Sequence, residues 1–181
     1  MQLKSYRQAK TADVPEGKEL GSETNKILIE RIAEIARIEG PVHTDVVIDR
    51  LRESYRLGRV KGSTRTRIQR SIANAIRRKI VMGDKRFIWS KKSQLSRSPR
   101  NAPDENFEHI APTELKAIVL ATANLLFGCT QRELVVETAR MLGFTRTGKR
   151  ITVVVSNTIQ QLLLNGKLKE SYGHILPSVE F

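Results

Sequence analysis

The stretch TRTRIQRSIANAIRRKIVMGDKRFIW, residues 64–89, determines the fold that the sequence predicts. Three isoleucines in it, Ile68, Ile72 and Ile76, follow one another at intervals of four residues, as the buried positions of one helix face do. We therefore predict a helix from Thr64 to Lys79. The opposite face has several arginines and no acid, whereas an ordinary hydrated surface, the alternative interpretation, would mix the two signs of charge.

The residues expected to contact a nucleic acid come from this helix and from the residues after it. Arginine binds phosphates and guanine edges, asparagine can read adenine, and lysine contacts the backbone. The candidates are Arg65, Arg67, Arg70, Asn74, Arg77, Arg78, Lys85, Arg86, Lys91 and Lys92.

A short hairpin is predicted directly after the helix. Two apolar runs flank a Gly-Asp pair at residues 83–84, and such a pair is typical of a tight turn. With a two-residue loop, Ile80 would lie opposite Phe87 on the buried face, and Lys85 and Arg86 would lie at or beside the tip. A basic helix followed by a basic hairpin is the second half of a winged helix-turn-helix, in which the helix enters the major groove of DNA.

The positive charge of the chain is concentrated around this stretch. The 181 residues include 32 Lys or Arg and 19 Asp or Glu. Residues 59–100 contain 14 of the basic residues and a single acid, so the other residues have 18 of each sign and no net charge. A block of one sign favours a polyanionic partner, and nucleic acid is the commonest.

The residues before this stretch complete a first module. Residues 1–22 are polar, with no periodic apolar pattern, and are interpreted as an arm. A helix is predicted from Thr24 to Ile38, ended by Gly40-Pro41, and a second helix from Thr44 to about Tyr55. With the basic helix and the hairpin, they form a predicted winged helix over residues 23–90.

The same order of elements recurs after residues 91–111, which have the composition of a linker. Landmarks of the two copies pair at offsets of 85 to 88 residues, for instance Gly40 with Gly128 and Gly58 with Gly143. In the second copy, helices are predicted at 113–127, 130–142 and 148–165, with a capping box between Thr130 and Glu133 and a hairpin over 167–176.

The predicted fold class is therefore mainly α (α+β), with two tandem winged helix-turn-helix modules, each of three helices and a small β-hairpin. The second module covers residues 112–181 and differs from the first in charge. The outer face of its third helix is uncharged, and we predict that it packs on another protein or on the first module. The residues of this face are Val153, Asn157, Gln160 and Leu164.

No catalytic or metal-binding constellation is evident in the sequence. The lone cysteine, Cys129, excludes an internal disulfide, and packing is favoured over reactivity for it. His43, His109 and His174 are scattered, with no spacing suited to a metal. We therefore expect no cofactor, no metal and no catalysis by this chain.

Several short motifs resemble one known family. They are Glu39-Gly40-Pro41-Val42-His43, Leu57-Gly58-Arg59, Arg67-Ile68, Phe87-Ile88-Trp89, Leu142-Gly143-Phe144 and Thr147-Gly148-Lys149-Arg150-Ile151. In these motifs the chain, from about Tyr6 to Leu176, is similar to the uncharacterised domain at the C-terminal end of large bacterial superfamily-one DNA helicases. There the domain follows the helicase motor and a Vsr-like nuclease domain, so the resemblance implies these two as partners.

The expected function is that of a non-enzymatic DNA-binding module, similar to the tail of a helicase or nuclease enzyme. It would hold duplex or junction DNA through the third helix and hairpin of its first module, with RNA as the alternative ligand. The alternatives are a protein-docking module of a helicase or nuclease complex and a transcription regulator. No apolar run reaches membrane-spanning length and the N-terminus lacks the apolar core of a signal peptide, so we expect a cytoplasmic protein with no membrane partner.

Overall fold

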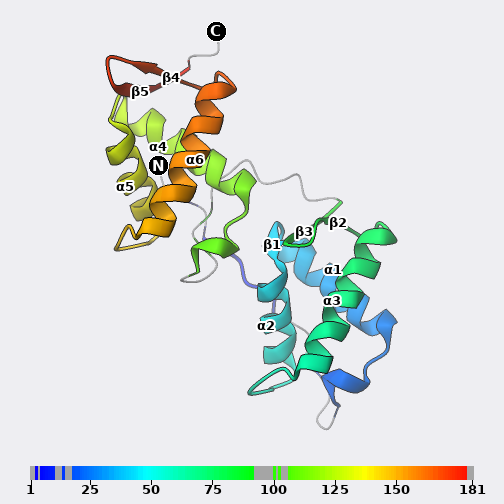
Figure 1. Cartoon of the computed structure of the whole chain (residues 1–181). Helices are drawn as coiled ribbons and strands as arrows, with labels where there is room; N and C mark the ends of the chain where they lie inside the picture. The colour runs from blue at the N-terminus through cyan, green and yellow to red at the C-terminus, as the bar shows by residue number, and fades with distance from the viewer. Residues whose placement is uncertain are drawn as a thin grey trace. The chain divides into compact units, whose positions relative to one another are not determined.

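The architecture is mainly helical, with six α-helices and small antiparallel strand pairs, which confirms the predicted α+β class (Figure 1). The structure is a computed structural model. The chain divides into two compact units, Arg7–Ser96 and Met1–Tyr6 with Arg97–Phe181. No helix in the described part of the chain is long and apolar enough to cross a membrane. The residues that the structure describes are 3, 5–10, 14, 18–91, 100, 102 and 106–178.

The first unit consists of a 3-10 helix, three α-helices and a three-stranded sheet. The sheet has the order β1-β3-β2, and both strand pairs are antiparallel. Helix α1 begins after Thr24, whose hydroxyl accepts a hydrogen bond from the backbone N–H of Ile27 at 3.3 Å. The elements are η1 (Leu20–Ser22), α1 (Asn25–Glu39), β1 (Val42–His43), α2 (Thr44–Ser54), α3 (Gly62–Arg77), β2 (Val81–Gly83) and β3 (Phe87–Ser90).

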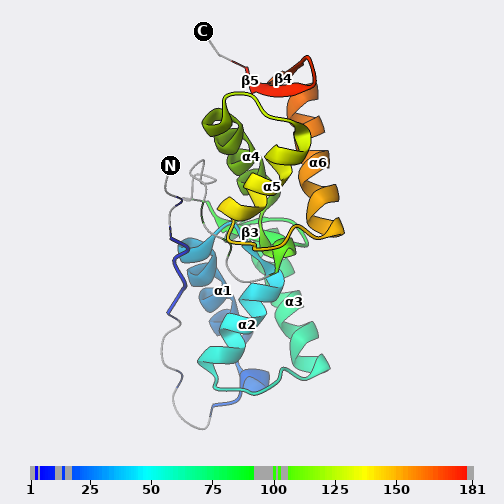
Figure 2. The same cartoon turned by 90° about the vertical axis from the view of Figure 1, so that its left-hand side faces the viewer.

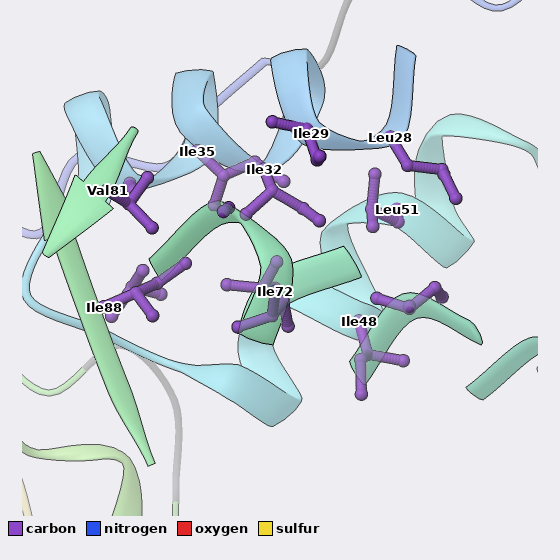
Figure 3. Packing of buried hydrophobic residues seen from close by; sticks show 14 of the residues in the cluster. Leu28, Ile29, Ile32, Ile35, Ile48, Leu51, Ile72, Val81 and Ile88 are labelled. Carbon is purple, nitrogen blue, oxygen red and sulfur yellow. The ribbon is translucent and has the colours of Figure 1, made fainter. Parts of the chain in front are cut away.

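The core of the first unit lies between its three helices and the sheet. Figure 3 shows Ile32 and Ile35, on the buried face of α1, beside Ile72 of α3 and Ile88 of β3. All four side chains are buried. The periodicity of a helix or of a strand places each of them on the face that points into the core. The burial of α3 therefore fixes which of its side chains face outward.

Two residues of the predicted polar arm belong to this core. Ala9 and Leu20 are buried in the same cluster as α1. The backbone N–H of Ala9 donates to Glu39 Oε1 at 2.9 Å, and this carboxylate also accepts from Arg50 Nε at 2.9 Å. The sequence did not predict this burial, because single apolar residues among polar ones have no periodicity.

The hairpin of the first unit has a different register from the predicted one. Val81 pairs with Ser90, and Ile80 lies outside the strand and is exposed. The backbone N–H of Asp84 donates to the carbonyl of Phe87 at 2.9 Å. The Asp84 carboxylate accepts from the backbone N–H groups of the residues at 86 and 87, so the tip of the hairpin is Lys85-Arg86 and not the Gly-Asp pair.

The second unit has the same order of elements, with its helices packed on one another and on the hairpin (Figure 2). Phe107 and Ile110 of the predicted linker are buried in its core, and the ring of Phe107 lies edge-on to Phe144 at 5.5 Å between centroids. The predicted capping box between Thr130 and Glu133 is confirmed. The elements are η2 (Phe107–His109), α4 (Pro112–Leu126), α5 (Gln131–Met141), α6 (Lys149–Leu164), β4 (Leu168–Ser171) and β5 (His174–Pro177).

The two units repeat one another at a constant offset of 87 residues. The three α-helices begin at residues 25, 44 and 62 in the first unit and at 112, 131 and 149 in the second. Their lengths are 15, 11 and 16 residues in both. The bridge Cys129–Ile175 has its counterpart in the pair Val42–Ile88. Such agreement indicates an internal duplication.

The constant offset corrects two predicted pairings of landmarks. The counterpart of Gly143 is Arg56, not Gly58, and both residues have a positive φ, of 94° and 51°. The counterpart of Gly128 is Pro41, not Gly40. The pairing of glycine with glycine was wrong because some residues with side chains also adopt a positive φ after a helix.

The register of the first hairpin predicts that Gly83 cannot be replaced by alanine without loss of stability. Its φ is 151°, and an added Cβ would lie 2.3 Å from the carbonyl oxygen of Phe87. We expect Gly83→Ala to lower the free energy of unfolding of the first unit by about 1–3 kcal/mol. The emission of Trp89, the sole tryptophan of the chain, reports on this unit during urea unfolding.

Gly58→Ala is the matched control. No atom lies within 4 Å of the position of its Cβ, and its φ is not in the left-handed region. We expect a change within about 0.5 kcal/mol, or a small gain in stability from the stiffer unfolded chain. Equal effects of the two substitutions would contradict the observed register.

Candidate nucleic-acid interface

Helix α3 presents arginines to solvent because its other face is buried. Ile68, Ile72 and Ala75 lie in the core, whereas Arg70 and Arg77 are exposed. The helix has no acidic residue along its 16 residues. Its outer face is therefore positively charged from end to end.

Two grooves follow this face of α3. The first has a volume of about 720 Å³, and Asn25, Arg70 and Asn74 are among its lining residues. The second has a volume of about 580 Å³, lies between α3 and the turn of the first hairpin, and has an apolar floor that includes Ile72 and Ile76. Arg77 lines both grooves, so the ridge between them is basic.

Five cations of α3, of the residue after it and of the first hairpin tip are not paired with an acid in the described residues. Arg70, Arg77, Arg78, Lys85 and Arg86 are exposed, and none of them forms an ion pair with an acid in the described part of the chain. The Arg77 Nη2 atom donates to Asn74 Oδ1 at 3.1 Å, which orients both side chains. We refer to these five residues and Asn74 as the basic surface.

Arg65 differs from the residues of the basic surface, because it is paired. Its Nη2 atom lies 2.5 Å from Asp45 Oδ1, at the beginning of α2. Both side chains are partly exposed, so the pair contributes little to stability, but the Asp45 carboxylate offsets the positive charge of Arg65.

Arg67 has a structural role that the sequence did not predict. Its guanidinium donates to the backbone carbonyls of Gly21, in η1, and of Glu23, between η1 and α1. The helical spacing placed Arg67 at the edge of the basic face, but it contains no information on which segment packs against that edge. We therefore remove Arg67 from the expected phosphate contacts.

The last two candidates of the first unit lie after the hairpin. Lys91 is exposed and lines a groove with Arg78 and with residues of α1, among them Ile29. Lys92 lies outside the described residues. The predicted linker therefore contributes one cation, Lys91, to the groove beside Arg78.

The corresponding face of the second unit is uncharged and includes two exposed apolar side chains. On α6, Val153 and Leu164 have relative exposures of 50% and 86%, and Asn157 and Gln160 are also exposed. The Gln160 Nε2 atom donates to Gln131 Oε1 at 3.2 Å. At the offset of 87 residues, Asn157 takes the position of Arg70 and Leu164 that of Arg77, so the duplication placed different chemistry on equivalent positions.

Two exposed aromatic residues of the second unit were not singled out by the sequence analysis. Tyr172 and Phe127 have relative exposures of 102% and 83%, and their φ angles are 50° and 48°. A bulky residue seldom adopts this left-handed region. The sequence signal for Tyr172 is its place in the centre of a hairpin, directly before a glycine.

Two of the remaining candidates for chemistry, Cys129 and His43, have structural roles. Cys129 is buried, and burial raises the pKa of its thiol, as expected for a packed residue and not for a nucleophile. The imidazole of His43 accepts a hydrogen bond from the backbone N–H of Asp45 at 3.2 Å and so caps α2. Its ring lies edge-on to Phe87 at 5.1 Å.

The different contacts of Arg67 and Arg70 predict different effects of their substitution. Arg67→Ala removes charged donors from two backbone carbonyls, so we expect the free energy of unfolding of the first unit to fall by about 1–2 kcal/mol. Arg70→Ala should change it by less than about 0.5 kcal/mol. Urea unfolding followed by Trp89 emission measures both, and an unstable Arg70→Ala variant would show that the exposed arginine is also structural.

Comparison with known proteins gives a partial match. Residues 19–65 match the model of a family described as "Protein of unknown function (DUF3320)". The matched segment runs from just before η1 into the first turn of α3. Neither the curated proteins nor the solved structures include a match to this chain. The segment that contains α1 and α2 of the first unit therefore resembles an uncharacterised domain family.

Proposed function

We propose that the first unit binds the phosphate backbone of duplex or junction DNA through the basic surface. The observation that carries the proposal is the group of five exposed cations, which form no ion pair with a described acid. A surface evolved only for solubility would mix Lys and Arg with Asp and Glu. On α3 no acid is present, and Asp84, the acid beside the hairpin tip, is engaged with the turn backbone.

The order of elements supports a winged helix as the mode of binding. In that arrangement the third helix enters the major groove and the hairpin contacts the adjacent backbone. Helix α3 would then present Arg70, Asn74 and Arg77 to the groove, while Lys85 and Arg86 at the hairpin tip contact phosphate. In that arrangement the two sugar-phosphate strands would lie along the grooves that Arg77 lines.

The resemblance to the tails of superfamily-one helicases supports DNA as the ligand and a non-enzymatic role. In such a setting the chain would hold DNA in the cytoplasm for a helicase motor and a Vsr-like nuclease domain. Binding through phosphates is independent of sequence, which favours this role over that of a transcription regulator.

A second function is proposed for the second unit, namely docking on a protein. Val153 and Leu164 are exposed on α6, at positions where the first unit has Thr66 and Arg77. Exposed apolar side chains on an uncharged helix face are typical of protein contacts. The helicase motor and the Vsr-like nuclease domain are the proposed partners of this face.

The basic surface predicts a strong dependence of DNA affinity on salt. Engaging about five phosphates gives a slope of log K against log salt concentration of about −4. Removal of two cations by Arg70→Ala with Arg77→Ala should flatten this slope by one to two units. Fluorescence anisotropy with a labelled blunt duplex at several salt concentrations measures the slope, and duplex RNA in parallel distinguishes the alternative ligand.

Arg37→Ala with Arg140→Ala is the matched control, since it also removes two positive charges. These arginines are paired with Glu34 and Glu137, on α1 and α5, and neither belongs to the basic surface. We expect the slope of this variant to equal that of the unmodified chain. Two variants with the same slope would show that net charge, and not α3, determines binding.

The proposed docking face predicts a separation of two activities. Val153→Glu with Leu164→Glu should abolish association with a superfamily-one helicase motor or a Vsr-like nuclease domain, because it places charge in an apolar contact. Affinity for blunt duplex DNA should stay within about twofold. Size-exclusion chromatography and anisotropy measure the two properties.

Thr113→Glu with Asn124→Glu adds the same charge at exposed positions of α4 and serves as the control. Association should survive this change. Loss of association in both variants would exclude a specific role for the α6 face.

A further inference from the structure

The hairpin of the second unit ends in an exposed tyrosine. Strands β4 and β5 pair up to Ser171 and His174, which leaves Tyr172 and Gly173 as the two central residues of the turn. Their φ angles are 50° and 76°, and positive values at both positions are the signature of a type I′ turn. The ring of Tyr172 has a relative exposure of 102%.

Neither the turn nor the core explains why this residue is a tyrosine. The first central position of a type I′ turn favours Asn, Asp or Gly, because a bulky side chain crowds the backbone in the left-handed region. Full exposure of the ring shows that packing within the described residues does not compensate for this conformation. At the tip of a hairpin, a strained and fully exposed aromatic side chain indicates a role in binding.

The duplication relates Tyr172 to the interface of the first unit. At the offset of 87 residues its counterpart is Lys85, at the tip of the first hairpin. Around this position the second unit has Asn157 and Leu164 where the first has Arg70 and Arg77. The equivalent surface therefore has no arginine at these two positions and has an aromatic ring at the tip.

An exposed ring with few cations around it suits the face of a nucleobase better than a phosphate. Aromatic side chains stack on bases of any sequence, and this is the usual mode of binding to unpaired strands. Lys169, exposed on β4, can contact the backbone of such a strand. Because both units belong to one chain, nucleic acid held by the first unit is at a high effective concentration for the second.

We propose that Tyr172 stacks on an unpaired or terminal base of the nucleic acid whose phosphates the first unit binds. The proposal rests on the proposed function of the basic surface and deepens it. The chain would then recognise junctions between paired and unpaired nucleic acid. The first unit would bind the duplex, and the second unit would bind the unpaired strand.

The test compares a forked DNA, with two single-stranded arms, with a blunt duplex that has the same paired segment. The unmodified chain should bind the fork more tightly than the blunt duplex. Tyr172→Ala should weaken binding to the fork by about 5- to 100-fold, the range for loss of one stacked base, and leave the blunt duplex unchanged. A 2-aminopurine placed at the junction should lose its quenching by the protein in this variant.

Three further variants separate stacking from folding. Tyr172→Phe keeps the ring and should retain the preference for the fork. Tyr172→Asn suits the turn better, so its melting temperature should equal or exceed that of the unmodified chain while its binding resembles that of Tyr172→Ala. Phe127→Ala removes an equally strained, exposed ring at the end of α4 and should change nothing.

Two results would overturn the inference and leave the proposed function intact. One is equal affinity of the unmodified chain for fork and blunt duplex. The other is unchanged binding of the fork by the Tyr172→Ala variant. If that variant also failed to associate with a helicase motor, the ring would be assigned to a protein contact instead. Failure of the proposed function is recognised separately, by an unchanged salt slope on blunt duplex after substitution of Arg70 and Arg77.

Discussion

The burial of one face of α3 is the constraint on which the proposed interface depends. Ile68, Ile72 and Ala75 are buried in the core of the first unit, and each large apolar side chain placed there contributes about 1.5–3 kcal/mol. A half-turn of the helix would expose these residues and bury Arg70 and Arg77, at a larger cost, because an unpaired charge is strongly disfavoured in an apolar core. The outward direction of the arginines is therefore a consequence of packing.

The same constraint acts in the second unit and makes the two surfaces comparable position by position. Val155, Ile159 and Leu162 lie 87 residues after the three buried positions of α3 and are buried as well. The core positions are apolar in both copies of the helix, whereas the compared outer positions are Arg70 and Arg77 in α3 and uncharged residues in α6. Two surfaces of different chemistry have thus been built on one scaffold, and neither surface requires a change in the fold.

A feature could be predicted from the sequence when it depends on residues close together in the chain, and not when it depends on contacts between distant segments. The capping box of α5 and the apolar face of α3 depend on spacings within one helix, and both were predicted. The burial of Ala9 and the bonding of Arg67 depend on segments 30 or more residues away, so the spacing within one helix contains no information on them. The first hairpin was misaligned because the Asp84 carboxylate, and not a Gly-Asp loop, closes the turn.

The N-termini of the helices show a further difference in charge that is consistent with an anionic ligand. Helices α2, α4 and α5 each have an acid in the first turn, and α1 has a threonine cap. The third helix of each unit, α3 or α6, has neither a side-chain cap nor an acid there. Because the N-terminal N–H groups carry a partial positive charge, an unpaired start of this kind is stabilised by a nearby phosphate.

On the basic surface, the self-repulsion of the cations opposes folding in the free chain. A ligand that neutralises these charges and binds the folded state more tightly than the unfolded chain stabilises the folded state. Binding of a polyanion would thus reduce the repulsion between the cations of the basic surface, which is unfavourable in the free chain.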